Sequence, residues 1–257
     1  MNKEIRNSKP VVALFVTCLV DLFRPSVAFA TIKLLESYGY RVVIPKAQSC
    51  CGQPAYNSGD YDGAKKIALK VINAFSKYDA VVIPSASCAG MMSKHFVELF
   101  KDDLEFSEKS IEFSKKTHEL ISFLSTIPNR KKLYSKFKGS ATYHDSCSSL
   151  REAGIKNQTR DLLREIDGLE LKELKNPEVC CGFGGTFCIK YPKISERMVS
   201  EKVADAVSTG ADVLLSGDLG CLMNIAGRVN REGKKIECRH VAEVLADMIS
   251  NSPIGKK

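Results

Sequence analysis

Short apolar runs alternate along the chain with longer stretches whose apolar residues recur at three- and four-residue steps. The longer stretches are typical of amphipathic helices, as in "YDGAKKIALKVINAFSKY" and "ISERMVSEKVADAVSTG". The short runs are typical of buried strands, as in "VVALFVTC", "DAVVIPSAS" and "ADVLLSGDLG". Strands that alternate with helices indicate parallel pairing through right-handed crossovers, so the pattern predicts an α/β fold.

The same order of elements occurs twice. In each half an apolar run leads into a cysteine, and a Cys-Cys-Gly doublet, an amphipathic helix and a buried strand ending at a last cysteine follow. The tails also match, "THELISFLSTI" against "RHVAEVLADMI", with His118 and His240 at equivalent places where a tail helix begins. The repeat predicts two pseudo-symmetric units, each a small, mostly parallel sheet flanked by helices. We place these units at residues 9–128 and 138–250.

The cysteines lie where the predicted strands end. Chain segments that leave the carboxyl ends of parallel strands meet at one edge of the sheet, where open α/β sheets bind ligands. We therefore expect four sulfurs from three loops to converge in each half. The two sets are Cys18, Cys50, Cys51 and Cys88 in the first half, and Cys147, Cys180, Cys181 and Cys221 in the second.

The number of cysteines, ten among 257 residues, narrows the chemistry. No run of about 18 uncharged apolar residues occurs, so we expect no transmembrane segment. Asp21 and Arg24 interrupt the apolar run that follows the basic start, and no small-residue cleavage site follows, so we expect no export signal. We expect a cytoplasmic protein that reaches a membrane, if at all, peripherally through a complex. In that reducing compartment, cysteines indicate metal or redox chemistry rather than disulfides. The net charge of +8 has no aromatic or Arg-rich binding motif beside it, so we expect no nucleic-acid partner.

The spacing of the cysteines favours an iron–sulfur cluster over a structural zinc ion. Zinc sites usually use close Cys-x₂₋₄-Cys pairs, and this chain has no Cys-x-x-Cys, whereas a wider cluster tolerates ligands from scattered loops. Helices predicted to begin at Cys88 and Cys221 would bring free N–H groups and a positive dipole end to the sulfurs. Glycines would let further backbone N–H groups approach a cofactor. These candidate cofactor-binding residues are Gly52, Gly182, Gly184 and Gly185.

Two ionisable residues, His144 and Asp145, precede Cys147 and are the candidate catalytic residues. The first half has Phe15 and Val16 at these places, so we expect the two centres to differ and the second to carry the function. His144 and Asp145 would offer a proton or an extra ligand to the second set of cysteines. The alternative is a hydrogen-bonded polar pair at the end of a strand.

Two further cysteines have no counterpart in the other half. Free cysteine commonly behaves as a small buried apolar residue, and we favour core packing for Cys238. Cys188 follows the second doublet in a Gly-rich loop, from which it could approach the second set of four cysteines.

The motifs resemble a known family. The order Cys, Cys-Cys-Gly, Cys is similar to the cysteine-rich CCG domain found in heterodisulfide reductase and in the glycolate oxidase iron–sulfur subunit. Within that group the chain resembles the lactate utilisation protein A family over nearly its whole length. The motifs that carry this resemblance include "FVTCLVDLFRPSVAFATIKLLE", "YHDSCSSLRE" and "CCGFGGTFCIKYPKIS".

The resemblance implies an iron–sulfur subunit of a complex that oxidises L-lactate to pyruvate, with electron transfer through cysteine-ligated clusters and no activity alone. It implies that each set of four cysteines ligates a metal centre, of the [4Fe–4S] type. The implied partners are lactate utilisation proteins B and C, of which B is the ferredoxin-like iron–sulfur protein. Heterodisulfide reductase-like members end each repeat in Cys-x-x-Cys, whereas Ser85 and Asp218 replace the first of those cysteines here, so four-cysteine ligation carries over.

Two alternative functions stay open at this point. One is a thiol–disulfide enzyme of the heterodisulfide reductase type, which the missing Cys-x-x-Cys disfavours. The other is a zinc-stabilised scaffold without enzymatic activity.

Overall fold

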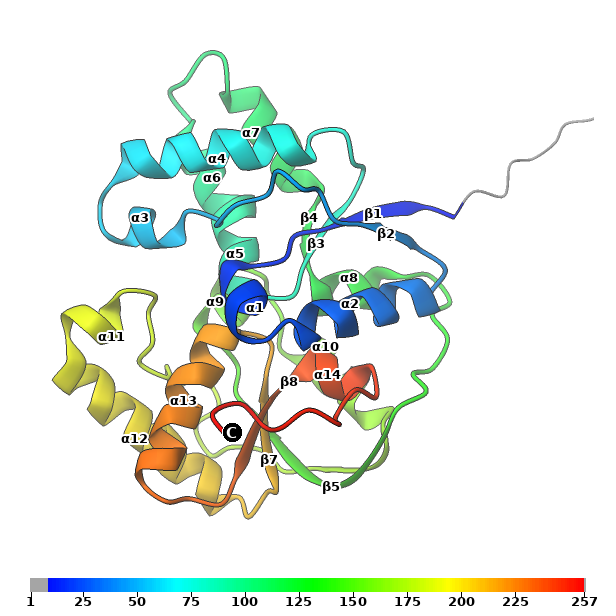
Figure 1. Cartoon of the computed structure of the whole chain (residues 1–257), viewed down its shortest axis with the longest axis vertical. Coiled ribbons are helices and arrows are strands. Elements are labelled where there is room, and N and C mark those ends of the chain that lie inside the picture. The colour runs from blue at the N-terminus through cyan, green and yellow to red at the C-terminus, as the bar shows by residue number, and fades with distance from the viewer. Residues whose placement is uncertain (1–8, 257) are drawn as a thin grey trace, which may run out of the picture.

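The computed structural model describes residues 9–256 and contains two four-stranded sheets, one in each half (Figure 1). All strand pairs are parallel, which confirms the predicted α/β fold with two repeated units. The first sheet has the order β2-β1-β3-β4, with β1 (Val11–Leu14), β2 (Arg41–Val43), β3 (Val81–Ile83) and β4 (Thr117–Glu119). The second has the order β6-β5-β7-β8, with β5 (Lys136–Tyr143), β6 (Asp167–Leu171), β7 (Val213–Ser216) and β8 (Glu237–His240).

Helices cover both faces of each sheet. Those of the first half are α1 (Cys18–Phe23), α2 (Ser26–Ser37), α3 (Gln53–Asn57), α4 (Tyr61–Phe75), α5 (Ala86–Gly90), α6 (Phe96–Leu99), α7 (Ser107–Lys115) and α8 (Leu120–Thr126), with a π-helical turn, Met91–His95, between α5 and α6. Those of the second half are α9 (Cys147–Arg151), α10 (Asn157–Arg164), α11 (Phe187–Lys190), α12 (Pro192–Ser208), α13 (Leu219–Arg231) and α14 (Val241–Leu245). None of the described helices has the length and apolar character needed to cross a bilayer.

The apolar periodicity seen in the sequence forms the core. Strand β3 is buried along its whole length because helices lie on both of its faces. On one face, α4 contributes Ala64, Ala68, Val71 and Phe75, which recur at the steps of a helical stripe and are buried. On the other face, residues of α2 and α8 belong to a second cluster that continues into the second half. One hydrophobic core therefore spans both halves of the chain.

The two halves meet in a pseudo-symmetric interface. Helix α2 contacts α14, and its structural counterpart α10 contacts α8, the counterpart of α14. The cysteine-bearing helices pair across the interface in the same symmetric way, since α1 contacts α13, and α9, the counterpart of α1, contacts α5, the counterpart of α13. Helices α2, α8, α10 and α14 lie between the two sheets in Figure 1. The sequence repeat thus becomes an approximate two-fold arrangement in which the cysteine-bearing helices contact one another across the interface.

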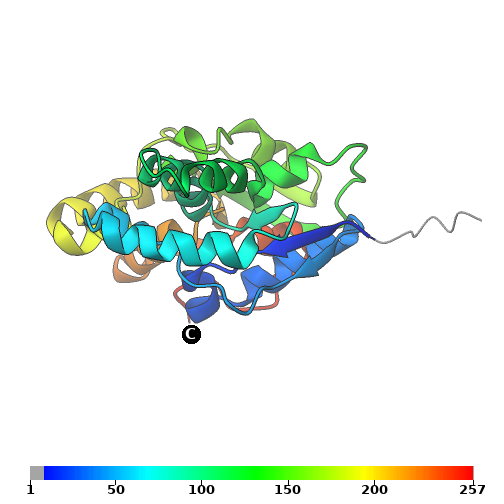
Figure 2. The same ribbon diagram turned by 90° about the horizontal axis from the view of Figure 1, so that it is seen from above.

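The strand order defines where a ligand would bind. In each sheet the chain leaves the two central strands toward opposite sides, which creates a crevice beyond their carboxyl ends. Cys18 follows β1 and Cys88 follows β3, and Cys147 and Cys221 follow β5 and β7 in the same way. Strand β1 runs toward the side of the molecule on which α11 lies (Figures 1 and 2). The carboxyl edges of the central strands therefore carry the cysteines, as the pattern predicts.

Candidate metal centres

The four cysteines of the first half converge in the crevice beyond β1 and β3. Cys18 is the first residue of α1, whose N-cap Thr17 accepts a hydrogen bond from the N–H of Val20. The Sγ atoms of Cys18 and Cys50 are 3.8 Å apart, and those of Cys51 and Cys88 are 3.3 Å apart. We call these cysteines the first centre. Its two pairs differ in burial, since Cys51 and Cys88 are buried and Cys18 and Cys50 are half-buried.

The second half repeats this arrangement as the second centre. Cys147 is the first residue of α9, capped by Ser146, and its side chain contacts Cys180. Cys181 contacts Cys221, and these two are again the buried pair. The N–H of Gly182 lies 3.4 Å from the Cys180 Sγ, as the N–H of Gly52 lies 3.5 Å from the Cys50 Sγ. Both glycines have a φ angle above +80°, a conformation that other residues rarely adopt.

The helices predicted to begin at Cys88 and Cys221 begin two residues earlier, at Ala86 and Leu219. The reason is that Ser85 and Asp218, at the places of the missing cysteines, have extended backbones and are the N-cap residues. Asp218 does not cap its own helix. Its carboxylate accepts hydrogen bonds from the N–H of Ser87, at 3.0 Å, and from the Ser85 hydroxyl, at 3.4 Å, across the interface between the halves. Cys88 and Cys221 still lie in the first turn, where the positive dipole end favours a thiolate.

Contacts among the sulfurs determine their acidity. The pKa of Cys51 is raised well above its usual value by its contacts with Cys50 and Cys88 and by burial. The pKa of Cys18 is raised by its contact with Cys50 and by burial. The pKa of Cys50 is lowered because the Cys18 and Cys51 thiols donate to it. Four thiols in this arrangement do not all ionise on their own, and a metal centre supplies the positive charge that lets them do so. The donor set therefore fits a thiolate-bound metal centre, either an iron–sulfur cluster or zinc.

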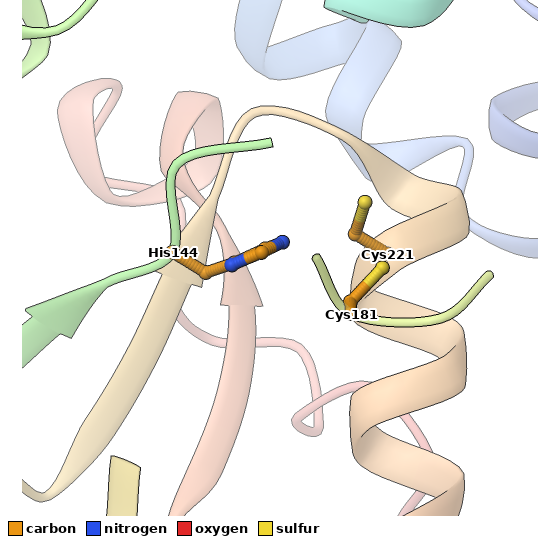
Figure 3. A group of neighbouring side chains, drawn as sticks. All are labelled: His144, Cys181 and Cys221. Atoms are coloured by element: carbon orange, nitrogen blue, oxygen red, sulfur yellow. The ribbon is translucent and has the colours of Figure 1, made fainter. Parts of the chain in front are cut away.

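His144 lies beside the buried pair of the second centre. A ring nitrogen of His144 and the sulfurs of Cys181 and Cys221 all lie within 4.8 Å of one another (Figure 3). The side chain is fully buried, and neither ring nitrogen has a hydrogen-bond partner among the described residues. Burial and the charge of Lys202 lower the pKa of His144 to about 3, so the imidazole is neutral.

Asp145 points to a different partner. Its two carboxylate oxygens accept hydrogen bonds from Arg160 at 3.0 and 2.8 Å, and both side chains are buried. The Arg160 guanidinium also donates to Glu173. The two adjacent candidate residues thus have different surroundings, because Asp145 has a charged partner and His144 has none.

A buried lysine, Lys202 of α12, is a charged neighbour of the second centre that the sequence pattern does not single out. Its Nζ donates to the carbonyl of Asn176 at 2.6 Å, and its charge acts on Cys181 and Cys180. Lysine is seldom buried, so an amphipathic pattern alone assigns it to the exposed side of a helix. The available signal is its place three residues after the buried Val199, on the apolar stripe of α12.

The first half has Val71 at the place of Lys202. A Cβ atom added to Gly52 would meet Ala64 and Ile67, and one added to Gly182 would meet Ser195 and Met198, which aligns α4 with α12. Val71 comes four residues after Ile67, as Lys202 comes four residues after Met198. The interior of the second half is therefore the more polar one.

Gly184 and Gly185 make room for side chains. A Cβ atom at Gly184 would lie 2.6 Å from the Cβ of Phe187, and one at Gly185 would lie 2.9 Å from the Asn57 Nδ2 of the first half. A role of these two glycines in cofactor binding stays a prediction. Cys188 donates to the carbonyl of Gly185 at 3.8 Å. Cys238 is buried in β8 within the core, as expected.

The predicted equivalence of His118 and His240 is wrong by one residue. His240 ends β8 and caps α14, where its Nδ1 accepts a hydrogen bond from the N–H of Ala242. The residue that ends β4 and caps α8 is Glu119, which accepts from the N–H of Ser122. His118 lies one position earlier, within β4, and packs against the ring of Phe123. Matching the tails by their histidines displaced the register by one residue.

Comparison with known proteins finds one domain profile in each half of the chain. The sequence profile of the cysteine-rich domain, CCG, matches residues 12–93 and 141–226. The chain is 48% identical over 234 residues to a lactate utilization protein A of Halalkalibacterium halodurans, covering 91% of this chain and 96% of that protein. It is 47% identical over 234 residues to lactate utilization protein A of Shouchella clausii, covering 91% and 98%.

A solved structure shares the fold at low sequence identity. The crystal structure of a hypothetical protein from Helicobacter pylori superposes with a TM-score of 0.68 at 11% identity. The match covers 95% of this chain and 51% of that chain. The two profile matches contain all eight converging cysteines, and the curated relatives match over nearly their whole length. The chain therefore belongs to the cysteine-rich domain family, among the proteins named lactate utilisation protein A.

Proposed function

We propose that this protein is the iron–sulfur subunit of a complex that oxidises L-lactate to pyruvate. The observation that carries the proposal is the convergence of four cysteines at the same strand ends in each half. The names of the relatives support lactate utilisation as the process. Ligands from three separate loops suit a cluster better than a single zinc ion, which usually uses two close pairs. The proposed ligands are Cys18, Cys50, Cys51 and Cys88 for one cluster, and Cys147, Cys180, Cys181 and Cys221 for the other.

A bound cluster, for which [4Fe–4S] is our proposal, supplies one-electron transfer. The chain holds the sulfurs in place and tunes their charge. The N–H groups of Gly52 and Gly182 point to the half-buried Cys50 and Cys180, which stabilises negative charge there. The buried ammonium of Lys202 does the same for the second centre.

The second centre is the one to which we assign the coupling of electrons to protons, through His144 and Asp145. Asp145 is already bound by Arg160, so its part is to position the end of β5. Neither ring nitrogen of His144 has a hydrogen-bond partner among the described residues, and one of them lies beside the sulfurs, which leaves the other available for a proton. Lactate oxidation releases two protons together with two electrons, and the first centre, with Phe15 and Val16 at these places, has no comparable group.

The proposed partners are lactate utilisation proteins B and C, with a ferredoxin-like iron–sulfur protein receiving the electrons. Electron transfer requires a partner close to a centre, and large apolar side chains are exposed beside both. Leu22, Phe23 and Phe29 are exposed near the first centre. Ile189, Tyr191 and Ile194 are exposed on the segment that follows the second doublet. We propose these exposed side chains as parts of the docking face.

Anaerobic purification with iron and acid-labile sulfide analysis tests the proposal. We expect a brown protein with about four irons and four sulfides per cysteine set if the clusters are cubanes. Cys181→Ser should remove the signal of one cluster from the electron paramagnetic resonance spectrum. Cys238→Ser is the matched control, because Cys238 is an equally buried cysteine outside both sets, and it should keep both signals.

Two results would contradict the proposal. A colourless protein that contains zinc but neither iron nor sulfide would indicate a scaffold. Disulfide reductase activity of the isolated chain would indicate the thiol–disulfide alternative.

A further inference from the structure

We propose that His144 is a metal ligand, so that the second centre binds its iron–sulfur cluster through nitrogen as well as sulfur. The inference rests on the proposed function for the identity of the cofactor. It goes beyond it by making the two centres chemically different, with an all-cysteine first centre and a second centre in which His144 takes one of the four iron positions in place of a cysteine.

The first observation is the position of the imidazole. Cys181 and Cys221 form the buried pair of the second centre, and a ring nitrogen of His144 lies within 4.8 Å of both sulfurs. Figure 3 shows the ring directed from the end of β5 toward these two side chains. Three donor atoms from three different elements therefore surround one point, as metal ligands do.

The second observation is that the ring has no other partner. His144 is 0% exposed, and both ring nitrogens lack a hydrogen bond among the described residues. Its backbone is paired on both sides, because its N–H donates to the Leu215 carbonyl at 2.8 Å and its carbonyl accepts from the Ser216 hydroxyl at 3.0 Å. The residue is thus fixed with a buried, unsatisfied imidazole. Such a group is costly unless a ligand or ion completes it.

The third observation comes from the repeat itself. The equivalent residue of the first half is Phe15, which is also fully buried and which packs against Phe75. An apolar ring therefore fits this place in the fold, and folding alone does not call for an imidazole. The first centre shows the same buried pair of cysteines, with 3.3 Å between the sulfurs, but no histidine of the described residues groups with that pair as His144 does with Cys181 and Cys221.

A histidine ligand changes the electron affinity of a cluster. A neutral imidazole that replaces one thiolate on an iron leaves the cluster with less negative charge, which raises its reduction potential. The buried Lys202, where the first half has Val71, acts in the same direction. The second centre would then hold an electron more tightly than the first.

The test is pulsed electron paramagnetic resonance on anaerobically purified protein, labelled with ¹⁵N-histidine, in the reduced state. We expect strong hyperfine coupling to a histidine nitrogen in one of the two cluster signals, and its loss in His144→Phe, which copies the residue of the first half. The midpoint potential of that cluster should become more negative in the variant. His118→Phe is the control, because His118 lies in β4, packed against Phe123, and should leave coupling and potential unchanged.

The outcomes separate this inference from the proposed function. Iron and sulfide in the expected amounts without histidine coupling would overturn the assignment of His144 as a ligand and leave the proposed function intact. Weak coupling, as expected from a ring that only donates a hydrogen bond to sulfur, would have the same meaning. A zinc-only protein would overturn the proposed function, and an all-sulfur zinc shell in X-ray absorption would then overturn the ligand too. If His144→Phe does not fold, the labelled wild-type protein alone decides, because among the described residues His144 is the histidine that groups with cysteines as potential ligands.

Discussion

Replacing Gly182 and Gly52 by alanine makes a matched pair of perturbations, because the two glycines occupy the same place in the two halves. Their φ angles are +81° and +85°. A Cβ atom at Gly182 would lie 2.8 Å from the backbone carbonyl oxygen of Ser195 and 3.1 Å from the Cβ of Met198. A Cβ atom at Gly52 would lie 3.3 Å from the Cγ2 methyl of Ile67. The backbone penalty is therefore shared, and the steric penalty is not.

The left-handed backbone costs an alanine about 1–2 kcal/mol in both variants. At Gly52 the nearest atom is the Cγ2 methyl of Ile67, a contact that a shift of a few tenths of an ångström relieves, so the total stays at about 1–2 kcal/mol. At Gly182 the contact is with backbone of α12, and the Ser195 hydroxyl also binds the Gly182 carbonyl at 2.8 Å, so the loop cannot move away freely. Overpacking of this kind adds about 1–3 kcal/mol, for a total of about 2–5 kcal/mol.

Urea unfolding of the reduced, metal-free chains, followed by circular dichroism, measures both values. The free energy of unfolding should fall more in Gly182→Ala than in Gly52→Ala by at least about 1 kcal/mol. Equal losses, or a larger loss at Gly52, would refute the argument that the close approach of α12 is what requires the second glycine. Iron content after anaerobic purification should follow the same order, because each loop carries a cysteine doublet.

Three further predictions concern ionisable and metal-binding groups. Cys181→Ser should abolish lactate-dependent electron transfer in the assembled complex, while Cys51→Ser should leave a measurable fraction; complete loss in both folded variants would instead favour two clusters in series. Arg160→Met leaves the buried Asp145 carboxylate without its partner, so the free energy of unfolding in urea should fall by about 3–5 kcal/mol. The double variant Asp145→Leu, Arg160→Met should recover most of this loss, and a double variant as unstable as the single one would contradict the reasoning. Burial raises the pKa of Glu119 from 4.5 to about 8, so the folded chain binds the carboxyl proton more tightly than the unfolded chain does. The free energy of unfolding should therefore fall as pH rises between these two values, by up to about 1.4 kcal/mol per pH unit. Glu119→Gln cannot ionise and should remove this part of the pH dependence, and identical pH profiles of unfolding for the two chains would disprove the assignment.

The fold could be predicted from the sequence because its main signals are local. Apolar runs, helical periodicity and the repeated cysteines each depend on neighbouring residues, and the parallel sheets with cysteines at their carboxyl ends follow from general rules of α/β topology. The start of the helices at Ala86 and Leu219 is not predictable in this way, since it depends on extended N-cap residues, Ser85 and Asp218, that bond to each other across the interface. Such a contact joins positions far apart in the sequence.

The polar surroundings of the second centre were only partly predictable. His144 and Asp145 are identifiable from the sequence because the first half has apolar residues at their places. That one of them has a charged partner and the other has none is not identifiable in this way. The bond from Arg160 to Asp145 depends on the packing of α10 against the end of β5. The burial of Lys202 depends on which side of α12 faces the doublet. The tail register failed for a similar reason, since identical residue types in the two tails do not occupy equivalent positions.

The pseudo-symmetric interface has a consequence for how the two centres came to differ. Paired contacts of the kind made by α2 with α14 and by α10 with α8 are those of an isologous homodimer, in which one patch meets a copy of itself. In a homodimer every mutation reaches both sites at once, so one site cannot hold a phenylalanine while the other holds a histidine. Joining the two units in one polypeptide removes that restriction. The covalent link between the halves is what allows Phe15 and His144 to coexist at equivalent positions, and with them two centres of different chemistry in a single gene product.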